Sequence, residues 1–328
     1  MTTGIDVEEA PALARRPRRV RWFRLASFAA AVCGGLFGLG VLWFELTSNP
    51  LADARAYYDA GARLNAGLPL YPTGQDVNQN TAYFYPPLFA MLFRPLALLP
   101  FPAAAIIWEV IVVGCFVATL WLLGVRRREV WYAVGVLGLP IAWTLGVAQA
   151  HSLVTLLLTI GTPLGIALAA NVKLFPLLAG LWFVGRRDRR RVIALAGWTA
   201  ALVALQLALE PQATVDYVRS LGLAWVGEVR NISPYAISQF LWLVLLGAGV
   251  LLTLRLAPTR FGWAAAVTLC TLAPPRLLSY MLIGLLAALR SDRFVVDDDR
   301  SYRDLDPATA PDVDPDEPGT GRLDPAIE

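Results

Sequence analysis

The stretch NPLADARAYYDAGARLNAGLPLYPTGQDVNQNTAYFYPP, residues 49–87, is the longest polar interruption between the hydrophobic segments of the chain. It follows an apolar run from Leu25 to Leu46, whose roughly 22 residues are enough to cross the hydrocarbon core of a bilayer. The stretch holds acids, amides and tyrosines close to the expected membrane surface. We therefore interpret this stretch as a loop that covers an active site, supported by the bundle of apolar helices that the rest of the chain forms.

The composition places the chain among membrane proteins. Of its 328 residues 57% are hydrophobic and 16% are charged, whereas soluble domains carry about 25% charged residues. The net charge of +3 combines a basic N-terminus and basic short loops with an acidic C-terminal tail. The positive-inside rule explains this distribution better than nucleic-acid binding does, so no nucleic acid is expected as a partner.

The apolar runs and the arginine clusters together predict a topology. Arg126, Arg127 and Arg128 and the cluster at 185–191 are expected in the cytoplasm, which places both termini inside and the loops 47–87 and 210–235 outside. Residues 88–100 are too short to span and predict a re-entrant or interfacial piece. The fold class is thus all-α, a bundle of about eight full spans plus two short helices, with spans expected at 25–46, 103–124, 130–148, within 152–184, and at 192–209, 236–256, 261–275 and 276–290.

Three regions are expected along the chain. Residues 1–24 form a disordered, basic cytoplasmic N-terminus, residues 25–294 the transmembrane domain, and residues 295–328 an acidic, Pro- and Asp-rich cytoplasmic tail that cannot bury enough apolar surface to fold. The cysteines at 33, 115 and 270 all lie in apolar runs without metal-ligand spacing, and there is a single histidine. We therefore expect neither a disulfide nor a metal site.

The first part of the polar stretch predicts an amphipathic helix. Asn49 and Pro50 are typical of a helix start, and Gly67 and Pro69 stop it after about Asn65. Helical spacing places Asp53, Tyr57, Ala60 and Leu64 on one face and Arg55, Asp59 and Arg63 on another. Such a helix is expected to lie on the membrane surface.

Several short motifs, in this order, resemble glycosyltransferase family 87, a group of GT-C type membrane enzymes. They are ADARAYYDAGARLNAGLPLY, AYFYPPLFAMLFRPLALLP with Trp108 in the next span, GVAQAH at 146–151 and ANVKLFP at 170–176. The resemblance covers roughly residues 45–290. Two features depart from the family pattern: His151 stands where an asparagine is usual, and the segment between His151 and Lys173 is shorter than in typical members.

The resemblance implies an integral-membrane enzyme of GT-C type that moves a sugar, with mannose expected, from a polyprenyl-phosphate donor. The acceptor would be an extracytoplasmic glycolipid or glycan, and the reaction a single inverting displacement in the cell membrane. No cofactor is expected beyond this donor substrate, and the partners are the donor, the acceptor and membrane lipids. The chemistry requires a base for the acceptor hydroxyl and cations for the departing phosphate.

Asp53 is the candidate catalytic base, because it lies just outside the first span, as the base does in GT-C enzymes. The alternative is that Asp53 supports a helix N-terminus, where aspartate is common. Asp59 is the competing carboxylate, but Arg55 and Arg63, each four residues away, favour a solvated ion pair. Asp76, in a turn-like segment, is expected at the surface.

Two cations are candidates for binding the donor phosphate. Lys173 is the only lysine of the chain and lies in an apolar run, where an ionisable group costs roughly 2.5–3.5 kcal/mol. Arg276 follows the helix-breaking Pro274-Pro275 and could act from another helix. The alternatives are a lysine that snorkels to the membrane rim and an arginine at the outer boundary.

Four further side chains are candidates for binding the sugar or the acceptor: Tyr57, Tyr85, Gln149 and His151. The tyrosines could stack on sugars, but an aromatic belt and a structural role are alternatives. Gln149 and His151 could bond sugar hydroxyls, or they could be satisfied polar residues at the rim.

Two other functions compete with the transferase. A transporter or flippase for a lipid-linked glycan would favour internal repeats and a continuous polar path, whereas the polar groups here cluster on one side. A non-catalytic scaffold would be favoured if Asp53 faced solvent.

Overall fold

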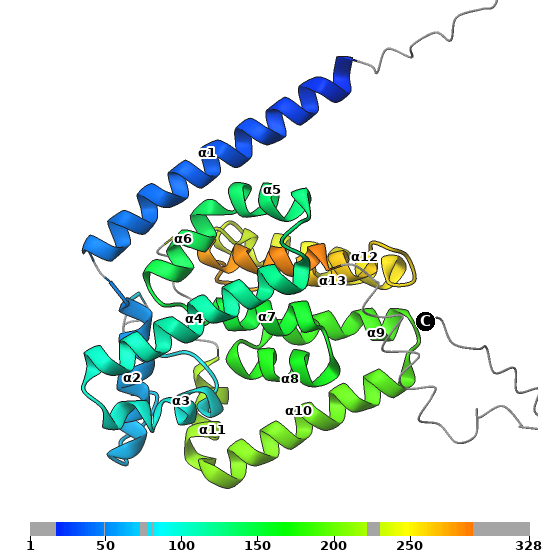
Figure 1. Cartoon of the computed structure of the whole chain (residues 1–328). Helices are drawn as coiled ribbons and strands as arrows, with labels where there is room; N and C mark the ends of the chain where they lie inside the picture. Colours follow the sequence, from blue (N-terminus) through cyan, green and yellow to red (C-terminus); the bar gives the residue numbers. More distant parts are fainter. Residues whose placement is uncertain (1–17, 49, 73–77, 80–81, 222–229, 291–328) are drawn as a thin grey trace, which may run out of the picture. The chain divides into compact units, whose positions relative to one another are not determined.

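The computed structural model describes residues 18–48, 50–72, 78–79, 82–221 and 230–290. These residues form helices and connecting turns and contain no strand (Figure 1), which confirms the all-α class. The expectations for residues 1–17 and for the acidic tail lie outside the described residues. The helices are α1 Arg18–Ser48, α2 Ala52–Asn65, α3 Pro87–Phe93, η1 Leu96–Leu98, α4 Phe101–Leu123, α5 Arg128–Val136, α6 Gly138–Gly146, α7 His151–Ile160, α8 Pro163–Val172, η2 Phe175–Gly180, α9 Leu181–Gly185, α10 Arg189–Leu209, α11 Pro211–Ser220, η4 Pro234–Ala236, α12 Gln239–Leu256, α13 Gly262–Leu272 and η5 Ser279–Leu289.

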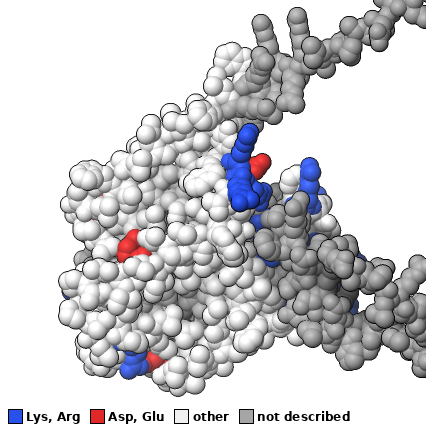
Figure 2. All heavy atoms as spheres, viewed as in Figure 1, with Lys and Arg blue, Asp and Glu red and all other residues white. Residues whose placement is uncertain are grey.

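Four described helices are long and apolar enough to cross a membrane: α1, α4, α10 and α12. Helices α5 and α6 add a fifth span if they are counted together, although they are bent by 69° at their junction. Large apolar side chains are exposed along these helices, and Figure 2 shows a face that is mostly uncharged. This surface fits contact with lipid, so the chain is a multi-pass membrane protein. The described helices do not confirm eight full crossings, because the rest of the apolar sequence forms shorter helices.

Helix α1 packs against α5 and α6 through glycine backbones. A Cβ atom added to Gly34 would collide with the backbone of Gly135, and one added to Gly38 would collide with the backbone of Gly138. In a membrane the hydrophobic effect does not drive helices together, so they associate through close van der Waals packing. Small residues such as glycine allow this close approach. Helix α1 begins at Arg18, inside the segment expected to be disordered, and the part of it that could span a membrane is Leu25–Ser48. Its C-terminal end leads directly into the polar stretch.

Residues 152–184, within which one full span was expected, form a short helical hairpin first. Helix α7 ends at Gly161, which has a φ of 61°, and Thr162 caps α8 by accepting a hydrogen bond from the Gly165 N–H. Ten residues in each arm rise only about 15 Å. The chain then breaks at Lys173 and continues through η2 and α9 to Gly185.

The amphipathic helix predicted in the polar stretch is α2, but it begins at Ala52 rather than at Asn49 or Pro50. Leu51 precedes it in the left-handed region, with a φ of 58°, and provides no side-chain cap. The backbone N–H groups of Leu51 and Asp53 instead donate to the carbonyls of Gly146 and Val147 at the end of α6, at 3.2 and 3.1 Å. One face of α2 packs against α3 and α4, so this helix is anchored in the protein and does not simply lie on lipid.

Candidate active site

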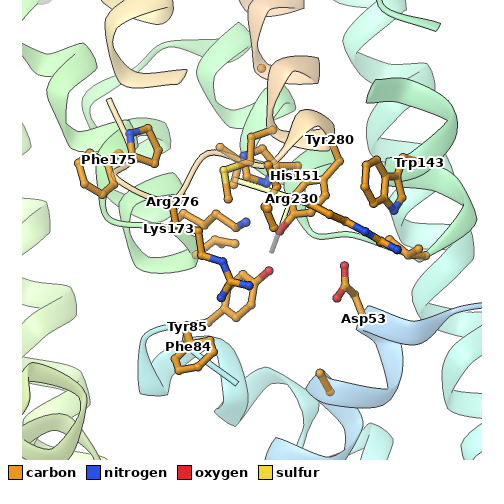
Figure 3. A pocket seen from close by; sticks show the side chains of 18 of the residues that line it. Asp53, Phe84, Tyr85, Trp143, His151, Lys173, Phe175, Arg230, Arg276 and Tyr280 are labelled. Carbon is orange, nitrogen blue, oxygen red and sulfur yellow. The ribbon is translucent and has the colours of Figure 1, made fainter. Parts of the chain in front are cut away.

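A cavity of about 620 Å³ opens beside the N-terminus of α2 (Figure 3). Its wall is built from the end of α1, from α2, from the segment before α3, from α6, α7 and α13, and from the loops after α8 and α13. Five of the seven predicted site residues line it: Asp53, Tyr85, His151, Lys173 and Arg276. Segments more than 200 residues apart thus meet at one cavity.

Asp53 is held in one orientation by a buried amide. The Nε2 group of Gln149 donates to Asp53 Oδ2 at 2.6 Å. The hydroxyls of Tyr57 and Tyr85 lie 2.6 and 2.8 Å from Gln149 Oε1 and donate to it. Because both hydroxyls donate to Oε1, the amide presents its N–H to the carboxylate, and within the described part of the chain no hydrogen bond to Oδ1 is found.

The surroundings change the acidity of Asp53. Desolvation at the cavity wall raises its pKa from an ordinary 3.8 to about 7, and Glu45 adds to this effect. Attraction to Lys173 and the hydrogen bond from Gln149 act in the opposite direction. A carboxylate whose pKa lies near neutrality is suited to accept a proton in a reaction.

Lys173 reaches the cavity from the break between α8 and η2. Its Nζ lies 5.1 Å from the centre of the Tyr85 ring and 4.9 Å from that of Tyr280. Aromatic faces attract an ammonium group and fix its position without neutralising it. The rings therefore fix the position of the Lys173 amino group at the cavity wall, and neither aromatic contact uses up its N–H donors.

Arg276 lies in the loop between α13 and η5. This loop is tied to the segment after residue 229 because Asn231 donates to the Pro275 carbonyl at 3.0 Å and accepts from the Leu277 N–H at 3.0 Å. Ile232 also donates to the Leu277 carbonyl at 2.9 Å. Arg276 interacts electrostatically with Lys173, so the two predicted phosphate-binding cations act on the same part of the cavity.

Tyr57 and Gln149 do not line the cavity. Both are fully buried behind it, and Tyr57 packs edge-on against Tyr85, Phe89 and Trp108. The structure thus places them as supports for Asp53 and Tyr85 rather than at the cavity wall where sugar contacts were expected. The His151 ring lines the cavity and packs 5.5 Å from the ring of Tyr280.

The competing carboxylate, Asp59, lies on the opposite face of α2. It accepts hydrogen bonds from Arg55 Nε at 3.0 and 3.1 Å, and both side chains are about half exposed. This is the predicted surface ion pair, and it has no part in the cavity wall. Asp76 lies outside the described residues.

The cavity wall also contains residues that the sequence analysis did not single out, among them Glu45, Arg230 and Tyr280. Glu45 is an acid inside the first apolar run, a signal that could have been used. Tyr280 lies in an apolar run where a tyrosine predicts nothing specific. Arg230 lies in the polar loop 210–235, which was expected to be external and where an arginine is ordinary.

Comparison with known proteins identifies the family. The model of "Glycosyltransferase family 87" matches residues 83–291. This chain belongs to glycosyltransferase family 87. The glycosyltransferase is 27% identical over 342 aligned residues to a "Polyprenol-phosphate-mannose-dependent alpha-(1-2)-phosphatidylinositol pentamannoside mannosyltransferase" of Mycolicibacterium smegmatis, an alignment that covers 88% of this chain and 81% of the relative.

A second relative is a "Polyprenol-phosphate-mannose-dependent alpha-(1-2)-phosphatidylinositol mannoside mannosyltransferase" of Mycobacterium tuberculosis. It is 28% identical over 223 residues, which cover 57% of this chain and 51% of the relative. No solved structure matches the glycosyltransferase significantly. The family match covers the cavity residues from Tyr85 onward, while Asp53 lies before it.

Proposed function

We propose that this glycosyltransferase moves a mannosyl group from a polyprenyl-phosphate donor to a hydroxyl of a glycolipid acceptor. Both curated relatives are named for polyprenol-phosphate-mannose and for phosphatidylinositol mannosides. The acceptor is therefore proposed to be a glycolipid with a mannosylated headgroup. The reaction is a single displacement with inversion at the sugar carbon.

Asp53 acts as the base in this proposal. Its Oδ2 is occupied by Gln149, so Oδ1 accepts the proton of the acceptor hydroxyl while the hydroxyl oxygen attacks the sugar. The pKa of about 7 keeps a large fraction of the group ionised at neutral pH. The proton ends on Asp53, and the new glycosidic bond forms as the bond to phosphate breaks.

Lys173 and Arg276 stabilise the departing phosphate. Both line the cavity with Asp53, and charge-assisted hydrogen bonds to phosphate oxygens strengthen as negative charge develops on them. Tyr85 and Tyr280 hold Lys173 in place. His151 and the exposed parts of these aromatic rings bind the sugar between the base and the phosphate.

We propose that the cavity opens to the extracytoplasmic side. The segment formed by η2 and α9 starts at the cavity residue Phe175 and ends at the arginine-rich turn 185–191, and η5 runs from the cavity residue Tyr280 toward Arg290. The positive-inside rule assigns that turn and Arg290 to the cytoplasm. The shorter apolar helices complete the remaining crossings, with the α7–α8 hairpin as a re-entrant element.

The observation that carries the proposal is a single cavity in a family 87 chain that holds a carboxylate with a pKa of about 7, Asp53, together with Lys173 and Arg276. The test incubates membranes containing the protein with labelled polyprenyl-phosphate-mannose and a phosphatidylinositol mannoside. Label should appear in a larger glycolipid, and linkage analysis should show inverted configuration.

Two results would contradict this proposal. Retained configuration would require a covalent intermediate and would remove the single displacement. Movement of intact donor across sealed vesicles without any product would favour the transporter instead.

A further inference from the structure

We infer that Arg230, stacked on Trp143, forms a second anion-binding position that holds the phosphodiester of the acceptor lipid. This inference rests on the proposed function, because it assigns the acceptor end of the same cavity. The donor phosphate and the acceptor phosphate would thus bind to different cations.

The backbone beside Arg230 is fixed to the loop that carries Arg276. Asn231 bonds both to Pro275 and to Leu277, and its Oδ1 also accepts from the Ser233 N–H at 2.9 Å. Because of these bonds, the backbones of Arg230 and Arg276 lie close to each other. The two arginines can therefore bind different groups only if their side chains extend in different directions.

The two side chains extend toward different ends of the cavity. Arg276 acts electrostatically on Lys173, whereas the Arg230 guanidinium carbon lies 5.2 Å from the centre of the Trp143 ring. Figure 3 shows the Arg230 side chain reaching toward Trp143 on the side of the cavity where Asp53 is drawn.

Trp143 links Arg230 to the base. It lies one turn before Val147 on α6, and the Val147 carbonyl accepts the Asp53 backbone N–H at 3.1 Å. The Trp143 ring lies 6.1 Å from the Tyr280 ring, which is one of the two rings that Lys173 contacts. Contacts along the wall therefore run from Lys173 over the rings of Tyr280 and Trp143 to Arg230. Asp53 is drawn beside the Arg230 end in Figure 3, and Lys173 also acts on it electrostatically.

This end of the cavity matches a polyhydroxylated headgroup that carries one phosphate. The carboxylates of Asp53 and Glu45 both line it and accept hydrogen bonds from hydroxyls, while they disfavour a highly charged anion. Arg230 makes no ion pair with another described residue, and its planar fork suits a phosphodiester. Lys173 and Arg276 are assigned to the donor phosphate, and the attacking hydroxyl must reach Asp53, beside which Figure 3 draws the Arg230 side chain. We therefore assign the anion at Arg230 to the acceptor.

The test compares two acceptors in steady-state kinetics: a phosphatidylinositol mannoside and an alkyl mannoside without phosphate. Arg230→Gln should raise the KM for the phosphate-bearing acceptor about tenfold or more, since a hydrogen bond to a charged group contributes about 1.5–3 kcal/mol. The KM for the phosphate-free acceptor and the KM for the donor should stay within about twofold. Arg230→Lys should recover part of the loss.

Arg219→Gln is the matched control, because Arg219 belongs to the preceding external helix, is 73% exposed and does not line the cavity. It should behave like the wild type with both acceptors. A rise in the donor KM in Arg230→Gln would assign the arginine to the donor phosphate, and an equal loss with both acceptors would reduce it to a structural role. Either result overturns the inference. An inactive wild-type protein would instead contradict the proposed function.

Discussion

The two faces of α2 each carry an aspartate with a cation nearby, and they differ in almost every other respect. Asp59 pairs with Arg55 at 3.0 Å on a face that is about half exposed. Asp53, six residues earlier, points into a cavity, bonds to a buried amide and interacts with Lys173 from a different part of the chain. Asp59 and Arg55 form a direct salt bridge, whereas no such contact joins Asp53 and Lys173 in the described structure.

The difference shows how the surroundings give one residue type two roles. An exposed i,i+4 ion pair contributes only about 0–1 kcal/mol to stability. A carboxylate at a desolvated wall is costly to ionise, and its fixed orientation keeps it ready for a substrate. The cavity pair is therefore expected to serve activity, and the surface pair a small part of stability.

The largest expected effect separates the two carboxylates. Asp53→Asn keeps the shape of the side chain but cannot accept a proton, so the rate of sugar transfer should fall about 10²–10⁴-fold. Asp59→Asn should stay within about twofold of the wild type. Both are measured as product formation at matched protein levels. The comparison fails if Asp59→Asn loses as much activity as Asp53→Asn.

The next largest effect separates the cation of the cavity, Lys173, from the cation of the surface pair, Arg55. Lys173→Ala removes a positioned charge beside the donor phosphate, so kcat/KM for the donor should fall about 10–100-fold. Arg55→Ala, which breaks the surface pair, should change it by less than about twofold. Thermal unfolding in detergent should be nearly unchanged in both variants. A well-folded Lys173→Ala protein with normal donor kinetics would remove the lysine from phosphate binding.

The dependence on pH tests the acidity of Asp53. The group acts as a base only when it is ionised, and its pKa is raised to about 7. Below this value kcat/KM should fall about tenfold per pH unit, and above it the rate should level off. The residual activity of Asp53→Asn should lack this slope. A profile that is flat from pH 5 to 8 in the wild type would show that no such group limits the reaction.

The smallest effect concerns the support of Asp53. Gln149→Leu removes the N–H that stabilises the ionised carboxylate, so the pKa of Asp53 should rise further, by up to about one unit. The low-pH limb of the rate profile should then move to higher pH, while donor KM stays nearly constant. A uniform loss of rate without this displacement would indicate only damaged packing.

Part of this site could be predicted from the sequence because its signals are local. The apolar runs gave the long helices, helical spacing placed Asp53 and Asp59 on different faces of α2, and the lone Lys173 stood out in an apolar segment. The resemblance to family 87 connected these residues to one chemistry.

The remainder depends on contacts between distant segments. Gln149 meets Tyr57 across 92 residues, and no local pattern says that its amide supports a carboxylate. The hairpin at Gly161 was missed because Gly-Thr-Pro is compatible with a kink as well as with a reversal. Arg230 is distinguished only by the ring on which it stacks.

The short helices beside Arg276 determine how deep the chemistry lies. Helix α13 has 11 residues, and η5 has 11, so they rise about 16 and 22 Å, less than the roughly 30 Å of the hydrocarbon core. In the proposed topology Arg260 and Arg290 lie at the inner boundary, so the loop between these helices would lie below the outer headgroups. A lipid-linked sugar can then meet Asp53 while its chain stays in hydrocarbon. Lifting even one five-carbon isoprene unit into water would cost about 4 kcal/mol. The sunken cavity therefore lowers the work of bringing two lipids together.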